Sequence, residues 1–167
     1  MSDCMEIGCN LKVSLAPRPF YYLYRTSLTM STEKITVTAL INAEKKTVWN
    51  KYTSPEHITQ WNFAHPSWHC PSASNDMRVG GKYSARMEAR DGSFGFDFDA
   101  FYTEVDPENS FTYEFGGRFA TITFTEQNAS TLLTIIFDPE TENPIEMQRE
   151  GWQAILDNFK KYSEIGI

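Results

Sequence analysis

The feature that most constrains the fold is a series of strand-like segments between residues 82 and 138. Within each segment apolar and polar residues alternate, which is the period of a strand with one buried face. The predicted strands lie at about 82–90, 94–105, 110–115, 118–126 and 130–138. Turn-forming residues separate them: Asp91-Gly92, Pro107-Glu108-Asn109, Gly116-Gly117 and Asn128. The sequence therefore predicts a sheet of antiparallel hairpins.

A further strand and two short helices are predicted before this series. Apolar residues occupy the odd positions of the segment 35–41, as in a half-buried strand. Asn42 can cap a first helix, and Ser54 and Pro55 provide the cap and the first residue of a second helix. Residues 62–75 have no period, and we expect them to form a loop.

One long amphipathic helix is predicted at the C-terminal end, because after Pro144 apolar residues recur at helical spacing as far as Tyr162. Phe98 and Phe101 have opposite parity in one strand, so we expect a bulge at about 99–101 that bends the sheet. A bent sheet has one apolar face to cover, and only this helix is long enough to cover it. The predicted fold is α+β, a curved antiparallel sheet of about six strands wrapped around the C-terminal helix.

The chain is expected to divide near residue 30. Residues 1–30 show no sustained period, and prolines and aromatics are crowded between Leu15 and Tyr24. We therefore expect an unstructured leader before a domain at 31–167. Met30-Ser31-Thr32-Glu33 resembles an ordinary protein start just before the first periodic segment, so the leader is expected to come from an upstream start codon. A docking tail is the alternative.

Charge and composition exclude several classes of protein. The net charge is −7 and no cluster of Lys and Arg occurs, which argues against binding to nucleic acid. No apolar run is long enough to span a membrane. The three cysteines, Cys4, Cys9 and Cys70, cannot form a complete disulfide framework, so we expect a cytoplasmic protein.

Polar residues give weak signals for chemistry. His65, His69 and Cys70 could offer ligands to zinc, but their loop lacks paired C-x-x-C motifs, so we expect no metal site and no cofactor. Asp97 and Asp99 alternate with phenylalanines and are expected on the outer face of the sheet rather than as a catalytic pair. No residue is assigned a catalytic role.

Aromatic residues, 14% of the chain, give the stronger signal. Large rings on the sheet and on the helix would hold the two apart and leave a cavity whose mouth lies near the loops. The residues expected to line it are Trp61, Trp68, Tyr83, Met87, Phe96, Phe98, Tyr113, Phe115, Phe124, Trp152, Leu156 and Phe159. Such a cavity suits an apolar ligand with one or two hydrogen-bonding groups.

Three segments carry a resemblance to a known family: Asp91-Gly92-Ser93 with Gly95–Phe98, Tyr102–Val105, and Gln148–Phe159. In these segments the chain resembles the AHSA-type proteins, which are similar to the C-terminal domain of the activator of heat shock protein 90 ATPase. That family belongs to the SRPBCC superfamily, with START, Bet v 1 and polyketide cyclase relatives. The resemblance covers residues 33 to 163 and implies a helix-grip fold.

The function expected first is binding or sensing of a small hydrophobic molecule in the cavity. The resemblance leaves two alternatives open, because its superfamily contains carriers, receptors, cyclases and co-chaperone domains. An enzyme of cyclase or hydrolase type would need His65, His69, Asp97 or Asp99 to face the cavity mouth. An interaction domain acting on a chaperone would need an exposed apolar patch. The sequence favours a binding protein over an enzyme.

Overall fold

A computed structural model describes residues 33–165, which form seven strands and three helices. The strands are β1 (Ile35–Ile41), β2 (Trp68–Asn75), β3 (Lys82–Ala89), β4 (Gly95–Asp106), β5 (Ser110–Phe115), β6 (Arg118–Gln127) and β7 (Ser130–Phe137). The helices are α1 (Lys45–Thr53), α2 (Pro55–Trp61) and α3 (Ile145–Ser163). The predicted leader and the boundary at residue 30 lie outside the described residues.

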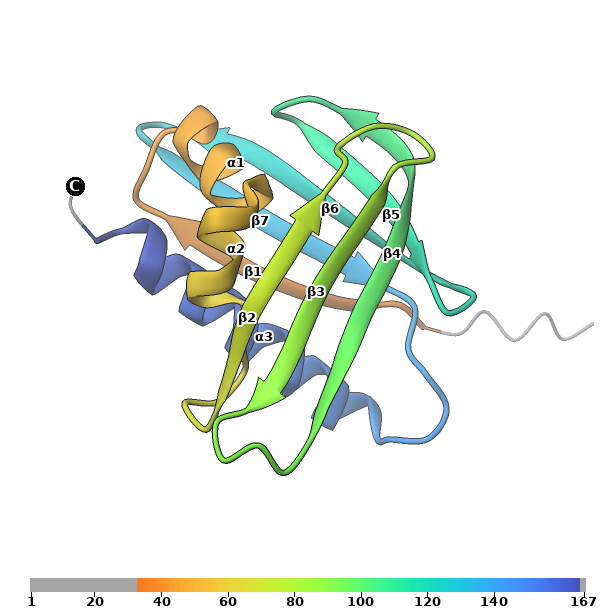
Figure 1. The fold of residues 1–167 in the computed structure, drawn as a ribbon. Helices are drawn as coiled ribbons and strands as arrows, with labels where there is room; N and C mark the ends of the chain where they lie inside the picture. The colour runs from red at the N-terminus through yellow and green to blue at the C-terminus, as the bar shows by residue number, and fades with distance from the viewer. Residues whose placement is uncertain (1–32, 166–167) are drawn as a thin grey trace, which may run out of the picture. The chain divides into compact units, whose positions relative to one another are not determined.

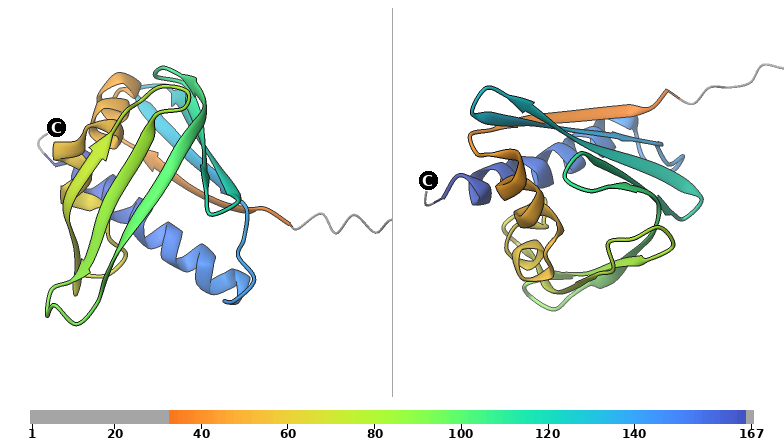
Figure 2. Two further views of the ribbon diagram at one scale, coloured as in Figure 1. Left: turned by 45° about the vertical axis from the view of Figure 1, so that its right-hand side comes forward. Right: turned by 90° about the horizontal axis from the view of Figure 1, so that it is seen from above.

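All seven strands form one antiparallel sheet in the order β1-β7-β6-β5-β4-β3-β2 (Figure 1). The sheet curls, so that β2, β3 and β4 lie across from β1 and β7 (Figure 2). Helix α3 packs on β1, α2 packs on β2, and the two helices contact each other. The helices thus bridge the two edges of the sheet. This arrangement confirms the predicted helix-grip fold.

The edge strand β1 is covered by side chains of α3. Gln153 donates a hydrogen bond to the backbone oxygen of Thr38 at 3.1 Å, and Lys160 donates one to that of Leu40. These contacts use carbonyl groups that an edge strand otherwise leaves open to pairing with another chain. They also fix the helix against the sheet.

The turns form where the sequence predicts them. Positive φ angles occur at Gly92 (73°), Glu108 (66°) and Asn128 (56°), and in the Gly116-Gly117 turn. Glycine and asparagine adopt this region at the lowest steric cost, which is why turn chemistry located the hairpins at Gly92, Gly116-Gly117 and Asn128 in advance. The turn at Glu108 was located by its neighbours Pro107 and Asn109.

Residues 68–75 are a strand, so the prediction of a loop throughout 62–75 is wrong. The segment pairs with β3 at the edge of the sheet, and its register shifts between His69 and Ser72. Pro71 lies in this shift, where its missing N–H costs least. An irregular edge strand lacks the two-residue period, which explains the missed assignment and raises the strand count to seven.

Two smaller expectations also need correction. The irregularity in β4 lies between Tyr102 and Glu104 in its pairing with β5, a few residues after the predicted bulge. Ala100 and Tyr102 therefore stay on the inner face, and Phe101 is exposed on the outer face. Helix α1 is preceded by Glu44 as its N-cap residue, not by Asn42.

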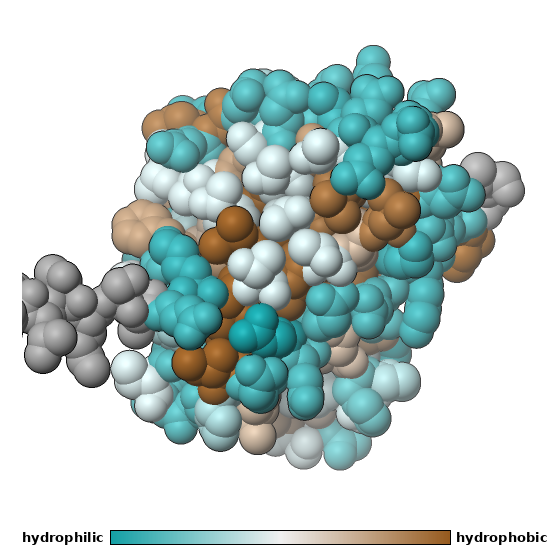
Figure 3. All heavy atoms as spheres, turned by 180° about the vertical axis from the view of Figure 1, so that it is seen from behind, coloured by the Kyte–Doolittle hydropathy of each residue, from teal (hydrophilic) through white to brown (hydrophobic). Residues whose placement is uncertain are grey.

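The convex face of β1, β7 and β6 is built mainly from threonines, with Leu40 and Ile136 exposed among them. Figure 3 shows this side of the molecule, where weakly polar and apolar residues lie between hydrophilic ones. Within residues 33–165 no helix is both long and apolar enough to cross a membrane.

Candidate ligand cavity

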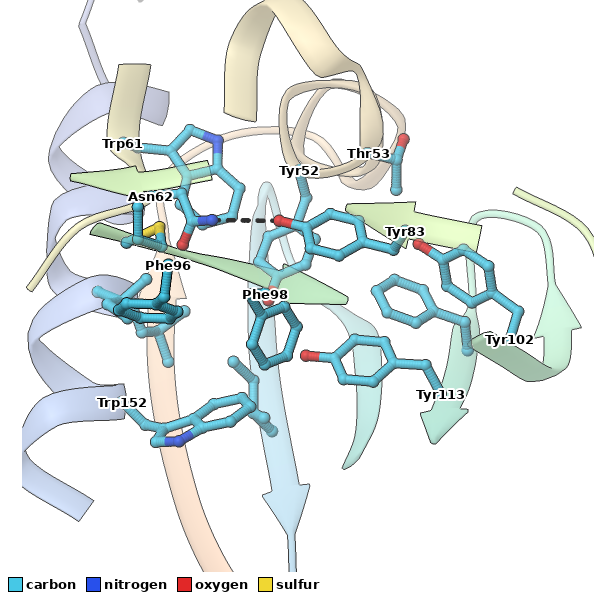
Figure 4. A pocket seen from close by; sticks show the side chains of 15 residues that line it. Tyr52, Thr53, Trp61, Asn62, Tyr83, Phe96, Phe98, Tyr102, Tyr113 and Trp152 are labelled. Atoms are coloured by element: carbon cyan, nitrogen blue, oxygen red, sulfur yellow. Dashed lines mark hydrogen bonds between the residues drawn. The ribbon is translucent and has the colours of Figure 1, made fainter. Parts of the chain in front are cut away.

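A cavity of about 240 Å³ lies between the concave face of the sheet and the helices (Figure 4). An engineered cavity of roughly 150 Å³ can hold a benzene molecule, so this one has room for a larger apolar compound. Fifteen residues line it: Tyr52, Thr53, Trp61, Asn62, Tyr83, Met87, Phe96, Phe98, Tyr102, Phe111, Tyr113, Ile135, Trp152, Ile155 and Leu156. Phe96 is 43% exposed, so this lining residue is also in contact with solvent.

The pairing of β3 with β4 explains why space remains beside so many rings. Tyr83 lies opposite Ala100, and Ala85 lies opposite Phe98. Both alanines are completely buried on the concave face. A small side chain opposite each ring leaves volume that two large side chains would fill.

Helix α3 provides the opposite wall through Trp152. Its indole stacks on Phe137 with ring centroids 4.2 Å apart and an interplanar angle of 18°. It also contacts Phe115 at 5.9 Å. The stacked ring is held against β7 and β5, while another part of its surface borders the cavity.

Two of the cavity tyrosines have hydrogen-bond partners in the protein. The Asn62 amide donates to the Tyr83 hydroxyl at 3.2 Å, and the Tyr102 hydroxyl donates to Asn75 at 2.8 Å. The Asn75 amide in turn donates to the backbone oxygen of Thr53 at 2.6 Å. These two separate sets of hydrogen bonds hold polar groups in an otherwise apolar lining.

The hydroxyl groups of Tyr52 and Tyr113 have no hydrogen-bond partner among residues 33–165. Burial raises the pKa of Tyr52 and Tyr113 above the ordinary value, and nearby phenol groups raise both further. Burial likewise raises the pKa of Tyr83. These groups are therefore neutral at physiological pH and can donate hydrogen bonds.

Eight of the twelve residues expected from the sequence line the cavity. They are Trp61, Tyr83, Met87, Phe96, Phe98, Tyr113, Trp152 and Leu156. Their common feature is an inward position on β3, β4 or β5, or a place on the sides of α2 and α3 that face the sheet.

The other four expected residues do not line it. Phe124 is covered by Trp49, with ring centroids 5.1 Å apart, and Phe159 is covered by Tyr52 and Trp61 at 4.9 Å each.

Phe115 is covered by Phe98 at 5.4 Å and by Trp152. Trp68 lies on the edge strand β2, where it contacts Phe94 and Phe96. For Phe115, Phe124 and Phe159, a ring from another element fills the space between the side chain and the cavity. The spacing of apolar residues along the sequence cannot reveal such a ring.

Seven lining residues were missed: Tyr52, Thr53, Asn62, Tyr102, Phe111, Ile135 and Ile155. Tyr52 shares its helical face with Val48, and Phe111 and Ile135 face inward on their strands, as core residues do. Nothing in the sequence distinguished them from core residues. Asn62 directly follows α2 and enters the cavity because the chain turns there.

The polar residues considered for catalysis lie elsewhere. Asp99 accepts a hydrogen bond from Ser84 at 2.6 Å and pairs with Lys82 on the convex face. Asp97 pairs with Arg86, which also donates to Glu88 at 2.8 Å. Both carboxylates therefore point outward, as the alternation with phenylalanine predicts.

The candidate zinc ligands have separate surroundings. His65 bonds Ser67 at 2.8 Å, and His69 lies 3.8 Å from a Glu88 oxygen. The Cys70 thiol is buried, which raises its pKa to about 11. Within the described part of the chain, no three His, Cys, Asp or Glu side chains gather as a metal site.

A curled antiparallel sheet that holds a C-terminal helix and encloses an aromatic cavity defines the class of helix-grip, Bet v 1-like proteins. Residues 42–164 match the family described as Activator of Hsp90 ATPase homolog 1-like protein. The chain belongs to this family, which is part of the SRPBCC superfamily. No functionally curated protein matches its sequence.

Solved structures agree with this assignment. An AHSA1-like protein from Aeromonas hydrophila is 37% identical with a TM-score of 0.76, covering 79% of this chain and 92% of its own. A protein from Cytophaga hutchinsonii is 43% identical with a TM-score of 0.69, covering 78% and 92%. A protein from Nitrosomonas europaea, 18% identical with a TM-score of 0.68, covers 79% and 94% and is similar in fold alone.

Proposed function

We propose that this protein binds a small hydrophobic molecule in the cavity between the sheet and α3. The observation that carries the proposal is the combination of about 240 Å³ of space with a wall made mostly of aromatic and aliphatic side chains. Ligand sites are typically concave, largely apolar and supplied with a few polar groups. We further propose a cytoplasmic location, because an odd set of three cysteines cannot form a complete disulfide framework.

The proposal assigns the ligand-binding role to the fifteen lining residues rather than to the twelve expected from the sequence. Catalysis in the cavity is not part of it, because Asp97 and Asp99 are paired on the convex face. A chaperone partner would need a broad exposed apolar patch. Within residues 33–165 the exposed large apolar residues are instead distributed over several strands, the first turn of α3, the segment after α3 and two loops.

The four tryptophans provide a built-in test with an internal control. Trp61 and Trp152 line the cavity, whereas Trp49 and Trp68 do not. We expect naphthalene to shift the indole N–H signals of Trp61 and Trp152 in a two-dimensional NMR titration, and to leave those of Trp49 and Trp68 nearly unchanged. Native mass spectrometry of freshly purified protein would identify any ligand that stays bound.

A matched pair of variants localises the binding. Ile155→Phe adds volume inside the cavity, while Ile145→Phe makes the same change on the same helix outside the lining. Ile155→Phe should weaken naphthalene binding and Ile145→Phe should not. Equal binding by both variants, or no shift at any indole, would contradict the proposal.

A further inference from the structure

Charged side chains are kept away from the cavity by the alternation of β3 and β4. Among residues 33–165, no Asp, Glu, Lys, Arg or His lines the cavity. Lys82 and Arg86 on β3 are paired with Asp99 and Asp97 on the convex face of the same sheet. A carboxylate or ammonium group placed in the cavity would therefore lose water without gaining an opposite charge, which is costly.

The polar groups that do reach the cavity are hydroxyls that can donate. Tyr52 comes from α1 and Tyr113 from β5, so they approach the cavity from different elements. Figure 4 shows the Tyr113 hydroxyl pointing toward the space beside Phe98 and Trp152. Neither hydroxyl is hydrogen-bonded to another residue within 33–165. A bound molecule with an acceptor atom would supply the missing partner.

We propose that the cavity selects uncharged molecules that carry a hydrogen-bond acceptor, such as a ketone oxygen, and that Tyr52 and Tyr113 recognise this atom. The inference rests on the proposed function and adds the chemical class of the ligand. It excludes fatty acids and other carboxylates as preferred ligands. The two tyrosines act as specificity determinants, while the surrounding rings supply contact area.

Three probes with one ring system separate these contributions. Naphthalene has no acceptor, 2-acetonaphthone has a neutral acceptor, and 2-naphthoate has a charged one at neutral pH. We expect 2-acetonaphthone to bind about fivefold more tightly than naphthalene, the effect of one neutral hydrogen bond. We expect 2-naphthoate to bind at least about tenfold more weakly than 2-acetonaphthone. Isothermal titration calorimetry gives all three dissociation constants.

Variants assign the preference to the hydroxyls. In Tyr52→Phe with Tyr113→Phe, the advantage of 2-acetonaphthone over naphthalene should disappear while naphthalene binding stays within about twofold. Tyr162→Phe is the matched control, because the Tyr162 hydroxyl bonds His57 at 2.6 Å and is not part of the lining. The indole NMR signals verify that each variant is folded.

The outcomes distinguish the two proposals. If naphthalene and 2-acetonaphthone both fail to bind, the proposed function itself fails. If naphthalene binds but 2-naphthoate binds as tightly as 2-acetonaphthone, ligand binding stands and the inference is overturned. Retention of the 2-acetonaphthone advantage in the double variant would likewise overturn it.

Discussion

Trp152 and Phe159 lie on the same helix but have different surroundings. Phe159 is completely buried and meets Tyr52 and Trp61 edge-on. Trp152 is only partly buried, stacks on Phe137 and borders the cavity. Since deleting atoms beside an existing void removes fewer contacts, the two rings should contribute differently to stability although Trp152 is larger.

We expect Phe159→Ala to lower the free energy of unfolding by about 3–5 kcal/mol. Trp152→Ala should lower it by only about 2 kcal/mol, because part of the indole already faces empty space. Urea denaturation of both variants measures the difference. A larger loss for Trp152→Ala than for Phe159→Ala would mean that the indole is packed as core.

Gly151 and Gly81 differ in whether the surrounding structure has room for a side chain. Gly151 lies inside α3, and a Cβ atom added there would meet no atom within 4 Å. Gly81 precedes β3, and a Cβ added there would overlap the backbone oxygen of Asp76. Glycine is therefore required at the approach to β3, whereas in the helix it only adds flexibility.

Gly151→Ala should raise the free energy of unfolding by up to about 1 kcal/mol, the difference in helix propensity. Gly81→Ala should lower it, because the backbone must move to admit the methyl group. Thermal unfolding of the two variants provides the comparison. Destabilisation by Gly151→Ala would show that α3 needs close backbone approach at this position.

At the level of the whole fold, four phenol groups converge on one interior. Burial is the main cause that raises the pKa of Tyr52, Tyr83, Tyr102 and Tyr113. In the unfolded chain each ionises near pH 10. Between that pH and the raised folded values, the folded state holds more protons than the unfolded state, so stability must fall as the pH rises.

We expect the free energy of unfolding to begin falling at about pH 10, by up to about 1.4 kcal/mol per pH unit for each buried tyrosine. Below that pH these tyrosines should contribute no pH dependence. Tyr113→Phe should make the fall in the free energy of unfolding above pH 10 less steep by the contribution of one proton, up to about 1.4 kcal/mol per pH unit. Urea denaturation between neutral and alkaline pH can measure this change. An unchanged slope would indicate that Tyr113 ionises equally in both states.

Much of the architecture follows from local sequence patterns. Alternation along 35–41 and along the hairpin series predicts the strands, positive-φ residues such as Gly92 and Asn128 predict the turns, and helical spacing after Pro144 predicts α3. These signals are local, because each depends on a few consecutive residues. They were sufficient for the helix-grip fold but not for the irregular edge strand β2.

The cavity depends instead on side chains from distant elements meeting in space. Phe98 borders open volume because Ala85 lies opposite it, while Phe124 is core because Trp49 covers it. Both phenylalanines have the same apolar character and inward parity, so no sequence pattern separates them. Strand register and helix docking determine how much volume each ring shares with its neighbours, and therefore which of the rings can contact a ligand.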